Sequence, residues 1–170
     1  MNNRKIILNL ATTLDWYIEW VNKEYDWCLT DQDYGFKKFL KSIDTIFMWK
    51  TSYEMAKDSI EEYFPNNKII VFSKTLEDKN ATIIKDNIDE EIKKMKSSKW
   101  KNIWMFWWAK LTKSLMDLKL IDQIQMAIHP ILLWGWTPLF LKNNERIKLK
   151  LVSNERYSSW MVILKYDVLY

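Results

Sequence analysis

Eleven tryptophans and two glycines in 170 residues are the feature that most limits how this chain can fold. Globular domains contain about 7% glycine, so roughly 12 glycines are expected in a chain of this length. Glycine reaches positive φ without a steric penalty, and turns, helix ends and phosphate-binding loops depend on it. The tryptophans stand in contexts that are typical of such loops, as in LDWYIEW, MFWWAKL and LLWGWTPLF.

We interpret this composition as the result of a decoding difference. The codon UGA is a stop signal in the standard code, tryptophan in some codes and glycine in a few bacterial lineages. A gene that uses UGA for glycine would give this sequence if UGA were translated as tryptophan. The alternative is that the indoles are genuine, which would favour an aromatic-rich interaction or sugar-binding protein with indoles as stacking platforms.

Composition and charge indicate a globular protein. The chain is 48% hydrophobic and 28% charged, and its length suits a single domain over residues 1–170 with a sizeable core. The net charge of +4 is interspersed, because lysines at 93, 94, 96 and 99 follow the acidic run 89–91. This pattern favours solvated helix faces over a nucleic-acid surface.

Cysteine content and hydropathy exclude several other classes. Cys28 is the lone cysteine, which excludes an intrachain disulfide and a cysteine metal cluster. No signal peptide is evident, and no apolar stretch reaches the 18 or more residues of a membrane span. We therefore expect a cytoplasmic protein without a membrane partner and without a metal site.

Short apolar segments alternate with amphipathic ones along most of the chain. The pattern predicts strands at 5–11, 45–48, 68–72, 81–85, 102–106, 123–128, 146–152 and 160–166. It predicts helices at 36–43, 52–63, 88–97 and 110–118. Such alternation indicates an α/β fold with a largely parallel sheet and helices on both faces. The last two strands lack an intervening helix, so we expect a mixed sheet that ends in an antiparallel pair.

The segment NIWMF-WW-AKL reads as a strand, a two-residue turn and a helix. A helix that begins directly after a strand offers free backbone N–H groups to an anion or nucleotide. Glycines at 107 and 108 would let the backbone approach a pyrophosphate, whereas two indoles would fill that space. The alternative interpretation of Trp107 and Trp108 is that they are core or partner-binding aromatics.

Seven strings in order resemble the dihydrofolate reductase-like superfamily, over nearly the whole chain. They are LDWYIEW (14–20), DW (26–27), DYGF (33–36), MWKTSYE (48–54), IWMFWWAKL (103–111), IHPILLWGWTPLF (128–140) and YSSW (157–160). The chain most resembles the branch of stand-alone proteins related to the reductase domain of bacterial riboflavin biosynthesis. The resemblance implies a three-layer αβα sandwich.

Nine tryptophans occupy positions where this family has glycine: Trp16, Trp20, Trp49, Trp100, Trp107, Trp108, Trp134, Trp136 and Trp160. Adding these nine to the two glycines present gives eleven, close to the expected roughly 12. Trp27 and Trp104 stand where the family tolerates tryptophan. If the family fold holds, nine forced indoles should make the literal polypeptide fold badly, because strain and overpacking together cost about 2–5 kcal/mol per site.

The resemblance implies that NADPH binds at the carboxyl edge of the sheet. The residues that it assigns to the cofactor are Ala11, Ile18, Trp49, Lys50, Thr51, Ser52, Ser73, Lys74, Phe106, Trp107, Trp108 and Ala109. Lys50 stands where the family usually has an arginine for the adenosine 2′-phosphate. A lysine lacks the bidentate fork of arginine, so we expect a weaker preference for NADPH over NADH.

The resemblance also implies a substrate pocket next to the nicotinamide, lined by Tyr17, Trp27, Asp31, Asp33, Tyr34 and Phe36. Reduction of a C=N or C=O bond needs a proton as well as a hydride, and a carboxylic acid with a raised pKa can supply it. The candidates are Asp15 and Asp33, with turn or helix-capping roles as the alternative. We expect a structural role for His129, the sole histidine.

The resulting expectation is an NADPH-dependent reductase of a pterin- or pyrimidine-type heterocycle, such as a riboflavin precursor. A second hypothesis is a nucleotide-binding protein of the same fold that does not catalyse a reaction. Relatives in this superfamily are often dimers, so a homodimer is a further expectation.

Overall fold

The computed structural model describes residues 4–21, 24–106, 109–143 and 145–170. In chain order the elements are β1 (Ile6–Thr13), β2 (Tyr17–Glu19), α1 (Phe36–Lys41), β3 (Ile43–Trp49), α2 (Lys50–Ala56), the 3₁₀ helix η2 (Lys57–Ser59), α3 (Ile60–Tyr63), β4 (Lys68–Phe72), β5 (Thr82–Ile84), α4 (Ile88–Ser97), β6 (Asn102–Phe106), α5 (Ala109–Asp117), β7 (Gln123–His129), β8 (Thr137–Pro138), β9 (Lys148–Arg156) and β10 (Val162–Leu169).

An eight-stranded mixed sheet forms the centre of the molecule, with the strand order β5-β4-β3-β6-β1-β7-β10-β9. Neighbouring strands from β5 to β7 are parallel. Strand β10 is antiparallel to both β7 and β9. This arrangement confirms the predicted mixed sheet with an antiparallel pair at the C-terminus, where β9 and β10 follow one another without an intervening helix.

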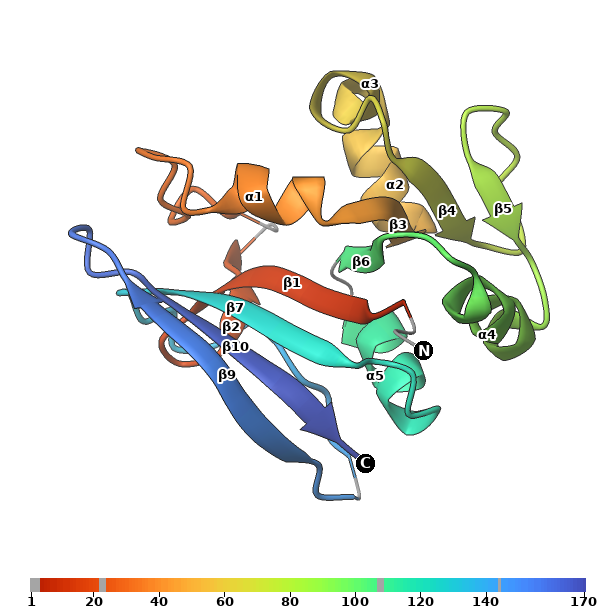
Figure 1. Ribbon diagram of the computed structural model, residues 1–170. Helices are drawn as coiled ribbons and strands as arrows, with labels where there is room; N and C mark the ends of the chain where they lie inside the picture. Colours follow the sequence, from red (N-terminus) through yellow and green to blue (C-terminus); the bar gives the residue numbers. More distant parts are fainter. Residues whose placement is uncertain (1–3, 22–23, 107–108, 144) are drawn as a thin grey trace.

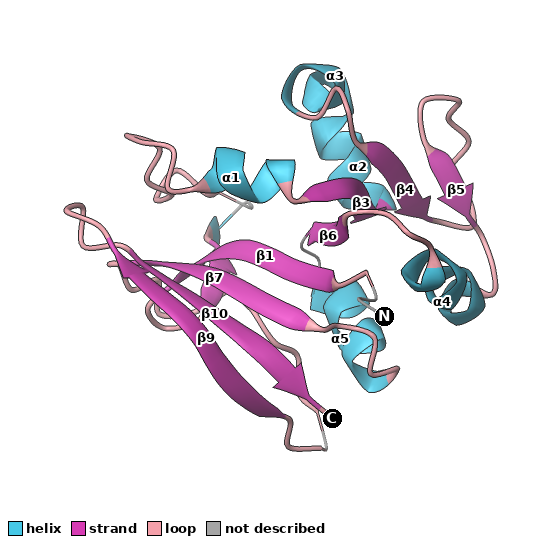
Figure 2. Cartoon of the chain, viewed as in Figure 1, coloured by secondary structure: helices cyan, strands magenta, loops and turns pink. Residues whose placement is uncertain are grey.

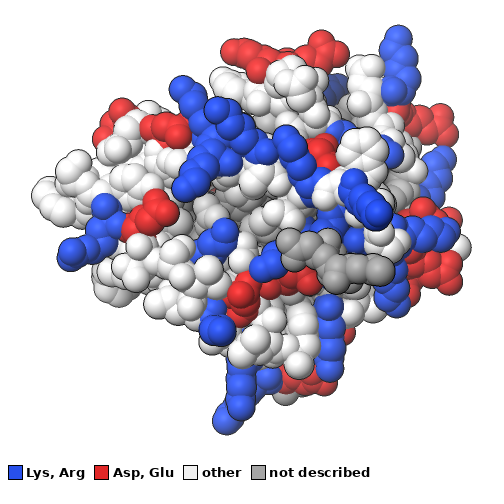
Figure 3. Space-filling view, in the orientation of Figure 1, with Lys and Arg blue, Asp and Glu red and all other residues white. Residues whose placement is uncertain are grey.

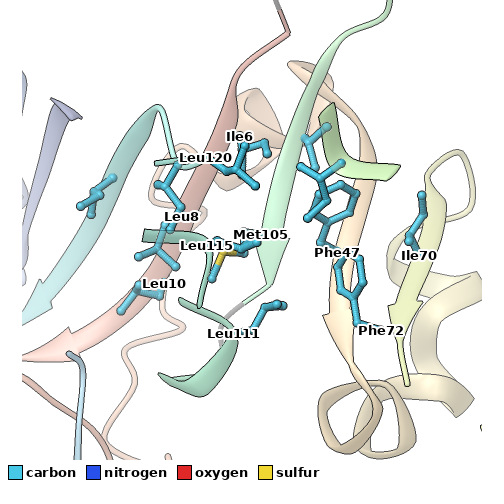
Figure 4. Packing of buried hydrophobic residues seen from close by; sticks show 14 of the residues in the cluster. Ile6, Leu8, Leu10, Phe47, Ile70, Phe72, Met105, Leu111, Leu115 and Leu120 are labelled. Carbon is cyan, nitrogen blue, oxygen red and sulfur yellow. The ribbon is translucent and has the colours of Figure 1, made fainter. Parts of the chain in front are cut away.

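Helices cover both faces of the sheet, as Figures 1 and 2 show. On one face Ile92 of α4 and Leu111 and Leu115 of α5 pack on the apolar side chains of β1 and β6. Figure 4 shows this cluster, in which the helix side chains meet those of the central strands. On the other face α1, α2 and α3 pack on β3 and β4 through a second buried cluster. The predicted three-layer αβα sandwich is confirmed.

Strand ends differ from the prediction by a few residues, and two predicted helices differ more substantially. The first helix ends at Lys41, and Ile43, assigned to it from its spacing, begins β3 and is buried as a strand residue. The carbonyl of Ser42 accepts a hydrogen bond from the N–H of Asn102, which pairs this segment with β6. The predicted helix 52–63 begins at Lys50 and is divided into α2, η2 and α3.

Four of the disputed tryptophans have a backbone conformation that favours glycine. Trp16, Trp134, Trp136 and Trp160 have φ of 66°, 59°, 97° and 64°. Positive φ is uncommon for residues other than glycine and is strained for bulky ones. Trp49, in contrast, has an ordinary extended conformation with φ −86°. Trp107 and Trp108 lie outside the described residues, and the decoding hypothesis itself stays a prediction.

The surface carries charges of both signs. In the view of Figure 3 basic and acidic side chains are interspersed over the same face. Along α4, Lys93 pairs with Asp89 and Lys94 with Glu91, as expected for a solvated helix face. Within the described part of the chain, no helix is both long enough and apolar enough to cross a membrane.

Candidate functional site

A cleft of about 730 Å³ lies on the α1 side of the sheet, over strands β1, β7 and β10. Its volume falls within the range of small-molecule sites, about 300–1,000 Å³. In the parallel part of the sheet it occupies the carboxyl halves of the strands, where open α/β sheets bind their ligands. On this face α2 and α3 pack on β3 and β4, whereas α1 packs beside Trp104 of β6 and extends away from β4 (Figure 1).

The floor of the cleft is made by paired residues of two central strands. Ala11 of β1 lies opposite Ala127 of β7, and Asn9 lies opposite Gln125. All four residues line the cleft, since side chains alternate between the two faces of a strand. The two methyl groups leave a flat, shallow surface, and the two amides border it on one side. Such a floor suits a planar ring with polar edges.

Aromatic rings form the wall nearest to α1. The rings of Phe36 and Phe64 each meet the ring of Trp104 edge to face, with centroids 5.6 Å and 5.5 Å apart. The indole N–H of Trp104 donates to the carbonyl of Asn9 at 2.9 Å. Trp104 is therefore a well-satisfied core tryptophan, in contrast to those with left-handed backbones.

The segment that leads into α1 forms a further part of the wall. Its cleft-lining residues are Tyr25, Cys28, Leu29, Thr30, Gln32, Asp33 and Tyr34. The Tyr34 hydroxyl is hydrogen-bonded to the Asp31 carboxylate and, at 2.8 Å, to Ser159 Oγ. Figure 1 shows this segment and the β9–β10 turn at the same end of the sheet. These contacts join the wall to the C-terminal hairpin.

The predicted substrate residues divide into two groups. Tyr34 and Phe36 line the cleft, as does Asp33. Tyr17, Trp27 and Asp31 do not line it. Trp27 packs behind the wall with its indole edge-on to His129, at a centroid distance of 5.3 Å. Its Nε1 is buried and has no hydrogen-bond partner among the described residues.

The two candidate proton donors have different environments. Asp15 accepts hydrogen bonds from Thr13 Oγ1 at 2.5 Å and from the N–H groups of Leu133 and Trp134. Burial alone would raise the pKa of Asp15, but these hydrogen bonds outweigh burial and lower its pKa. A lowered pKa and a position outside the cleft lining suit a loop anchor better than an acid. Asp33 lines the cleft and also accepts the N–H of Lys37 at 3.1 Å, which ties it to the first turn of α1, although the N-cap residue is Gly35.

The predicted cofactor residues lie at neighbouring strand ends. Ala11, Ile18, Ser52 and Phe106 line the cleft. Trp49, Lys50 and Thr51 stand where β3 meets α2, and Ser73 and Lys74 follow β4, the strand paired with β3. Ala109 is the first residue of α5, and the predicted pyrophosphate turn at 107–108 lies outside the described residues.

Hydrogen bonds connect the basic and hydroxyl side chains at the β3–β4 edge. Lys50 Nζ donates to Thr75 Oγ1 at 3.1 Å and pairs with Glu54 at 3.7 Å. Ser73 Oγ accepts the N–H groups of Thr75 and Leu76 at 3.2 Å and 3.0 Å. A lysine with neighbouring hydroxyl groups is a donor set that suits a phosphate.

Sequence reasoning missed several polar residues of the cleft, and three of them bear on its chemistry. Glu19, Gln125 and His129 all line it. The strand period could have placed Gln125 and His129 on the face of Ala127, but the sequence does not show which face carries the cleft. Glu19 accepts a hydrogen bond from Thr137 Oγ1 at 2.5 Å, across the short β2–β8 pair. No cluster of three or more metal-ligating side chains occurs among the residues that the structure describes.

No family model matches the chain. The Bacillus subtilis (strain 168) protein YyaP, described as uncharacterized, is 38% identical to it over 98% of this chain and 96% of YyaP. This chain belongs to the YyaP family. A second B. subtilis protein, YwjB, also described as uncharacterized, is 26% identical over 91% of this chain and 92% of its own length.

Solved structures resemble this YyaP-family chain in fold. A Shewanella sp. PV-4 protein provisionally assigned to riboflavin biosynthesis has a TM-score of 0.85 at 19% identity, covering 98% of this chain and 99% of that one. A dihydrofolate reductase from Enterococcus faecalis, complexed with NADP(H), has a TM-score of 0.71 at 13% identity over 98% of both chains.

A third structure is longer than this chain. The Thermotoga maritima diaminohydroxyphosphoribosylaminopyrimidine deaminase/5-amino-6-(5-phosphoribosylamino)uracil reductase has a TM-score of 0.77 at 10% identity. The alignment covers 98% of this chain and 57% of that protein. At these identities the likeness establishes the dihydrofolate reductase-like fold.

Proposed function

We propose that this YyaP-family protein is an NADPH-dependent reductase of a pyrimidine- or pterin-type heterocycle. A compound like 5-amino-6-(5-phosphoribosylamino)uracil, named in the T. maritima relative by fold, is the leading candidate. The observation that carries this proposal is that one cleft joins the two predicted halves of the site. Ala11, Ile18 and Ser52 of the cofactor prediction share it with Tyr34 and Phe36 of the substrate prediction.

The donor set at the β3–β4 edge supports the cofactor half. Lys50 would bind the 2′-phosphate of the adenosine, with the hydroxyl groups of Thr51 and Thr75 beside it. Ser73 would border the ribose, and Ser52 would face the diphosphate from the cleft side. When bound, NADPH supplies the hydride for the reduction of a C=N or C=O bond.

The chain's own groups position the ring and deliver the proton. The flat floor at Ala11 and Ala127 holds a planar heterocycle, and the aromatic wall at Phe36 and Phe64 excludes water from it. Of the two proton donors predicted from the sequence, Asp15 and Asp33, only Asp33 lines the cleft, so we assign the proton transfer to Asp33. Asp33 would donate the proton to the substrate either directly or through a water molecule that it holds by a hydrogen bond.

The first experiment measures the affinity of the protein for NADPH and for NADH, followed by NADPH oxidation with 5-amino-6-(5-phosphoribosylamino)uracil. We expect NADPH to bind more tightly. Lys50→Gln should weaken NADPH binding about tenfold, the effect of one charged hydrogen bond to a phosphate, and leave NADH binding unchanged. Lys93→Gln, on the solvated face of α4, is the matched control. Equal losses for both dinucleotides in Lys50→Gln would contradict the proposed phosphate contact.

A nucleotide-binding protein without catalysis is the alternative on the same fold. It would bind NADPH in this assay but would not oxidise it with any member of a panel of pterins, pyrimidines and flavin precursors. Turnover with one of them at a rate above the uncatalysed reaction excludes it.

Exposed indoles favour a different function if the tryptophans are genuine. Trp16, Trp20, Trp134 and Trp136 are all exposed, and they flank the β2–β8 pair, where the carbonyl of Trp16 accepts the N–H of Leu139. Such a group of indoles could stack on a sugar or a partner protein. Binding of oligosaccharides to the unmodified chain, with loss in Trp134→Ala, would support this function.

We also propose that the natural polypeptide carries glycine at the nine disputed positions. The left-handed backbones of Trp16, Trp134, Trp136 and Trp160 support this. The codons decide it: we expect UGA at the nine positions and UGG at Trp27 and Trp104. UGG throughout would refute the decoding hypothesis and favour the aromatic surface.

A further inference from the structure

His129 is the last residue of β7, in the middle of the sheet and at the carboxyl end of its strand. Its backbone pairs with Thr13 of β1 on one side, and the side chain is 3% exposed and lines the cleft. A central strand with hydrogen-bonded neighbours is rigid, so the imidazole is held in a fixed place relative to the alanine floor.

The wall of the cleft determines which nitrogen of His129 carries the hydrogen. Its Nδ1 accepts a hydrogen bond from the backbone N–H of Leu29 at 3.2 Å. In a neutral imidazole one nitrogen accepts and the other donates. An acceptor at Nδ1 therefore leaves the hydrogen on Nε2. Burial lowers the pKa of His129, so the neutral form with this tautomer predominates at pH 7.

The Nε2–H group has no partner in the described protein. Among the described residues, the imidazole of His129 makes one hydrogen bond, and that bond uses Nδ1. Among the described residues, the buried side-chain polar atoms that lack a hydrogen-bond partner are Trp27 Nε1 and Thr112 Oγ1. His129 Nε2 is not one of them, so it retains some accessible surface, and His129 is a lining residue of the cleft. A donor in a mostly apolar cleft gains a partner when a ligand supplies an acceptor.

The amide side chains of the floor lie at some distance from His129 along the strand. Gln125 and His129 are four residues apart on one face of β7, about 13 Å at the rise of a strand, with Ala127 between them. A planar ring on Ala127 can thus meet a donor at one edge and the amides of Asn9 and Gln125 at the other. The edges of pyrimidines and pterins carry carbonyl oxygens that accept such a hydrogen bond.

We propose that His129 is a specificity-determining residue, whose Nε2–H donates a hydrogen bond to a carbonyl oxygen of the heterocyclic substrate. The Nδ1 contact with Leu29 fixes the tautomer and anchors the 25–34 wall. This inference rests on the proposed function, because it takes the substrate to be a heterocycle that binds on the alanine floor. It assigns a binding role to a residue for which the sequence predicts a structural one.

Two substitutions separate the two nitrogens. His129→Asn keeps an acceptor near the position of Nδ1 and removes the Nε2 donor. His129→Gln places an amide N–H near the position of Nε2 and removes the Nδ1 acceptor. We expect His129→Asn to keep the wild-type Tm and to weaken binding of 5,6-diaminouracil, a ring probe, at least tenfold. We expect His129→Gln to lower Tm and to retain more of the ring affinity than His129→Asn.

A direct readout is available because His129 is the sole histidine. Imidazole ¹⁵N spectra of the wild-type protein should show one protonated nitrogen, Nε2, and its proton signal should move when the ring probe is added. In steady-state assays His129→Asn should raise KM for the substrate and leave the dissociation constant of NADPH within twofold.

Three results would overturn the inference. Unchanged ring affinity in His129→Asn would leave His129 as a wall anchor alone. A loss confined to NADPH would mean that the imidazole contacts the cofactor instead. If the wild-type protein binds NADPH but no ring probe, the substrate class fails and this inference fails with it.

A different result would refute the proposed reductase and not this inference. If the wild-type protein does not bind NADPH but its ring affinity still depends on Nε2, His129 remains a ring-binding residue.

Discussion

Replacement of Trp134 and Trp160 by glycine should stabilise the folded protein. Both residues have left-handed backbones, with φ of 59° and 64°, and both side chains are largely exposed, at 83% and 82%. A side chain this exposed contributes little burial, so its removal costs little. The backbone hydrogen bonds at both sites, Trp134 N–H to Asp15 and Trp160 N–H to the Tyr157 carbonyl, do not need an indole.

The magnitude follows from two opposing effects. A residue with a Cβ in the left-handed region costs about 1–2 kcal/mol, and glycine adds about 0.5–1 kcal/mol of backbone entropy to the cost of folding. The net gain is about 0.5–1 kcal/mol per site, or about 1–2 kcal/mol for the pair. For a chain of this size, that free energy raises Tm by about 2–8 °C.

Trp100 provides the matched control. It is 73% exposed, and it is not among the residues with positive φ. Trp100→Gly should therefore lower stability by about 0.5–1 kcal/mol, because it gains flexibility without relief of strain. Thermal and urea unfolding of the three variants and the parent provide the comparison. If the Trp134/Trp160 double variant loses stability as Trp100→Gly does, the argument from backbone strain is refuted.

Two further predictions concern titratable groups. Hydrogen bonds lower the pKa of Asp15 in the folded state, so its stabilising contribution is present above its unfolded pKa and is lost as the pH falls through the folded pKa. Urea unfolding between pH 6 and pH 3 should show this loss, and Asp15→Asn should reduce stability at pH 6 by about 1–3 kcal/mol and flatten the pH dependence; an unchanged pH profile would contradict the anchor role. Burial, followed by the charge of Asp26, raises the pKa of Cys28 to about 11, so iodoacetamide should alkylate Cys28 slowly at pH 8 and much faster toward pH 11. A ring ligand should protect Cys28, which lines the cleft, whereas rapid alkylation at pH 7 would mean that the wall opens.

The main elements of the fold could be predicted because continuous apolar runs mark the buried strands and helical spacing of apolar residues marks α4. The structure places β4, α4 and β6 at 68–72, 88–97 and 102–106, as the sequence indicates. The strands β2 and β8 were not predicted, since segments of three and two residues carry no measurable period. They form by pairing with each other, a contact between positions that are far apart in the chain.

The candidate site was predictable only in part. Motifs placed Tyr34 and Phe36 near the substrate, and both line the cleft. The sequence predicts a structural role for His129, because a lone histidine in a sequence carries no information about the surroundings of its side chain. Its link to Leu29 spans 100 positions, and no local pattern encodes such a contact. Tertiary contacts of this kind decide whether a polar residue supports a loop or faces a ligand.

The substrate half of the site should not depend on whether the tryptophans are genuine. Of the described residues that line the cleft, none is one of the nine disputed positions; its single tryptophan is Trp104. The proposed pyrophosphate turn at 107–108, in contrast, consists of two of them. Ring binding and NADPH binding should therefore respond differently when these two positions become glycine.

Two variants isolate this difference on a common, relaxed background. The first carries glycine at 16, 134, 136 and 160, which removes the left-handed indoles, and the second also carries glycine at 107 and 108. We expect 5,6-diaminouracil to bind both variants with dissociation constants within twofold, because the alanine floor and His129 are the same. NADPH should bind at least tenfold more tightly to the second, because a pyrophosphate can approach the backbone of a glycine turn. Equal NADPH affinity would show that the indoles at 107 and 108 do not obstruct the cofactor, and the argument for glycine there would rest on the codons alone.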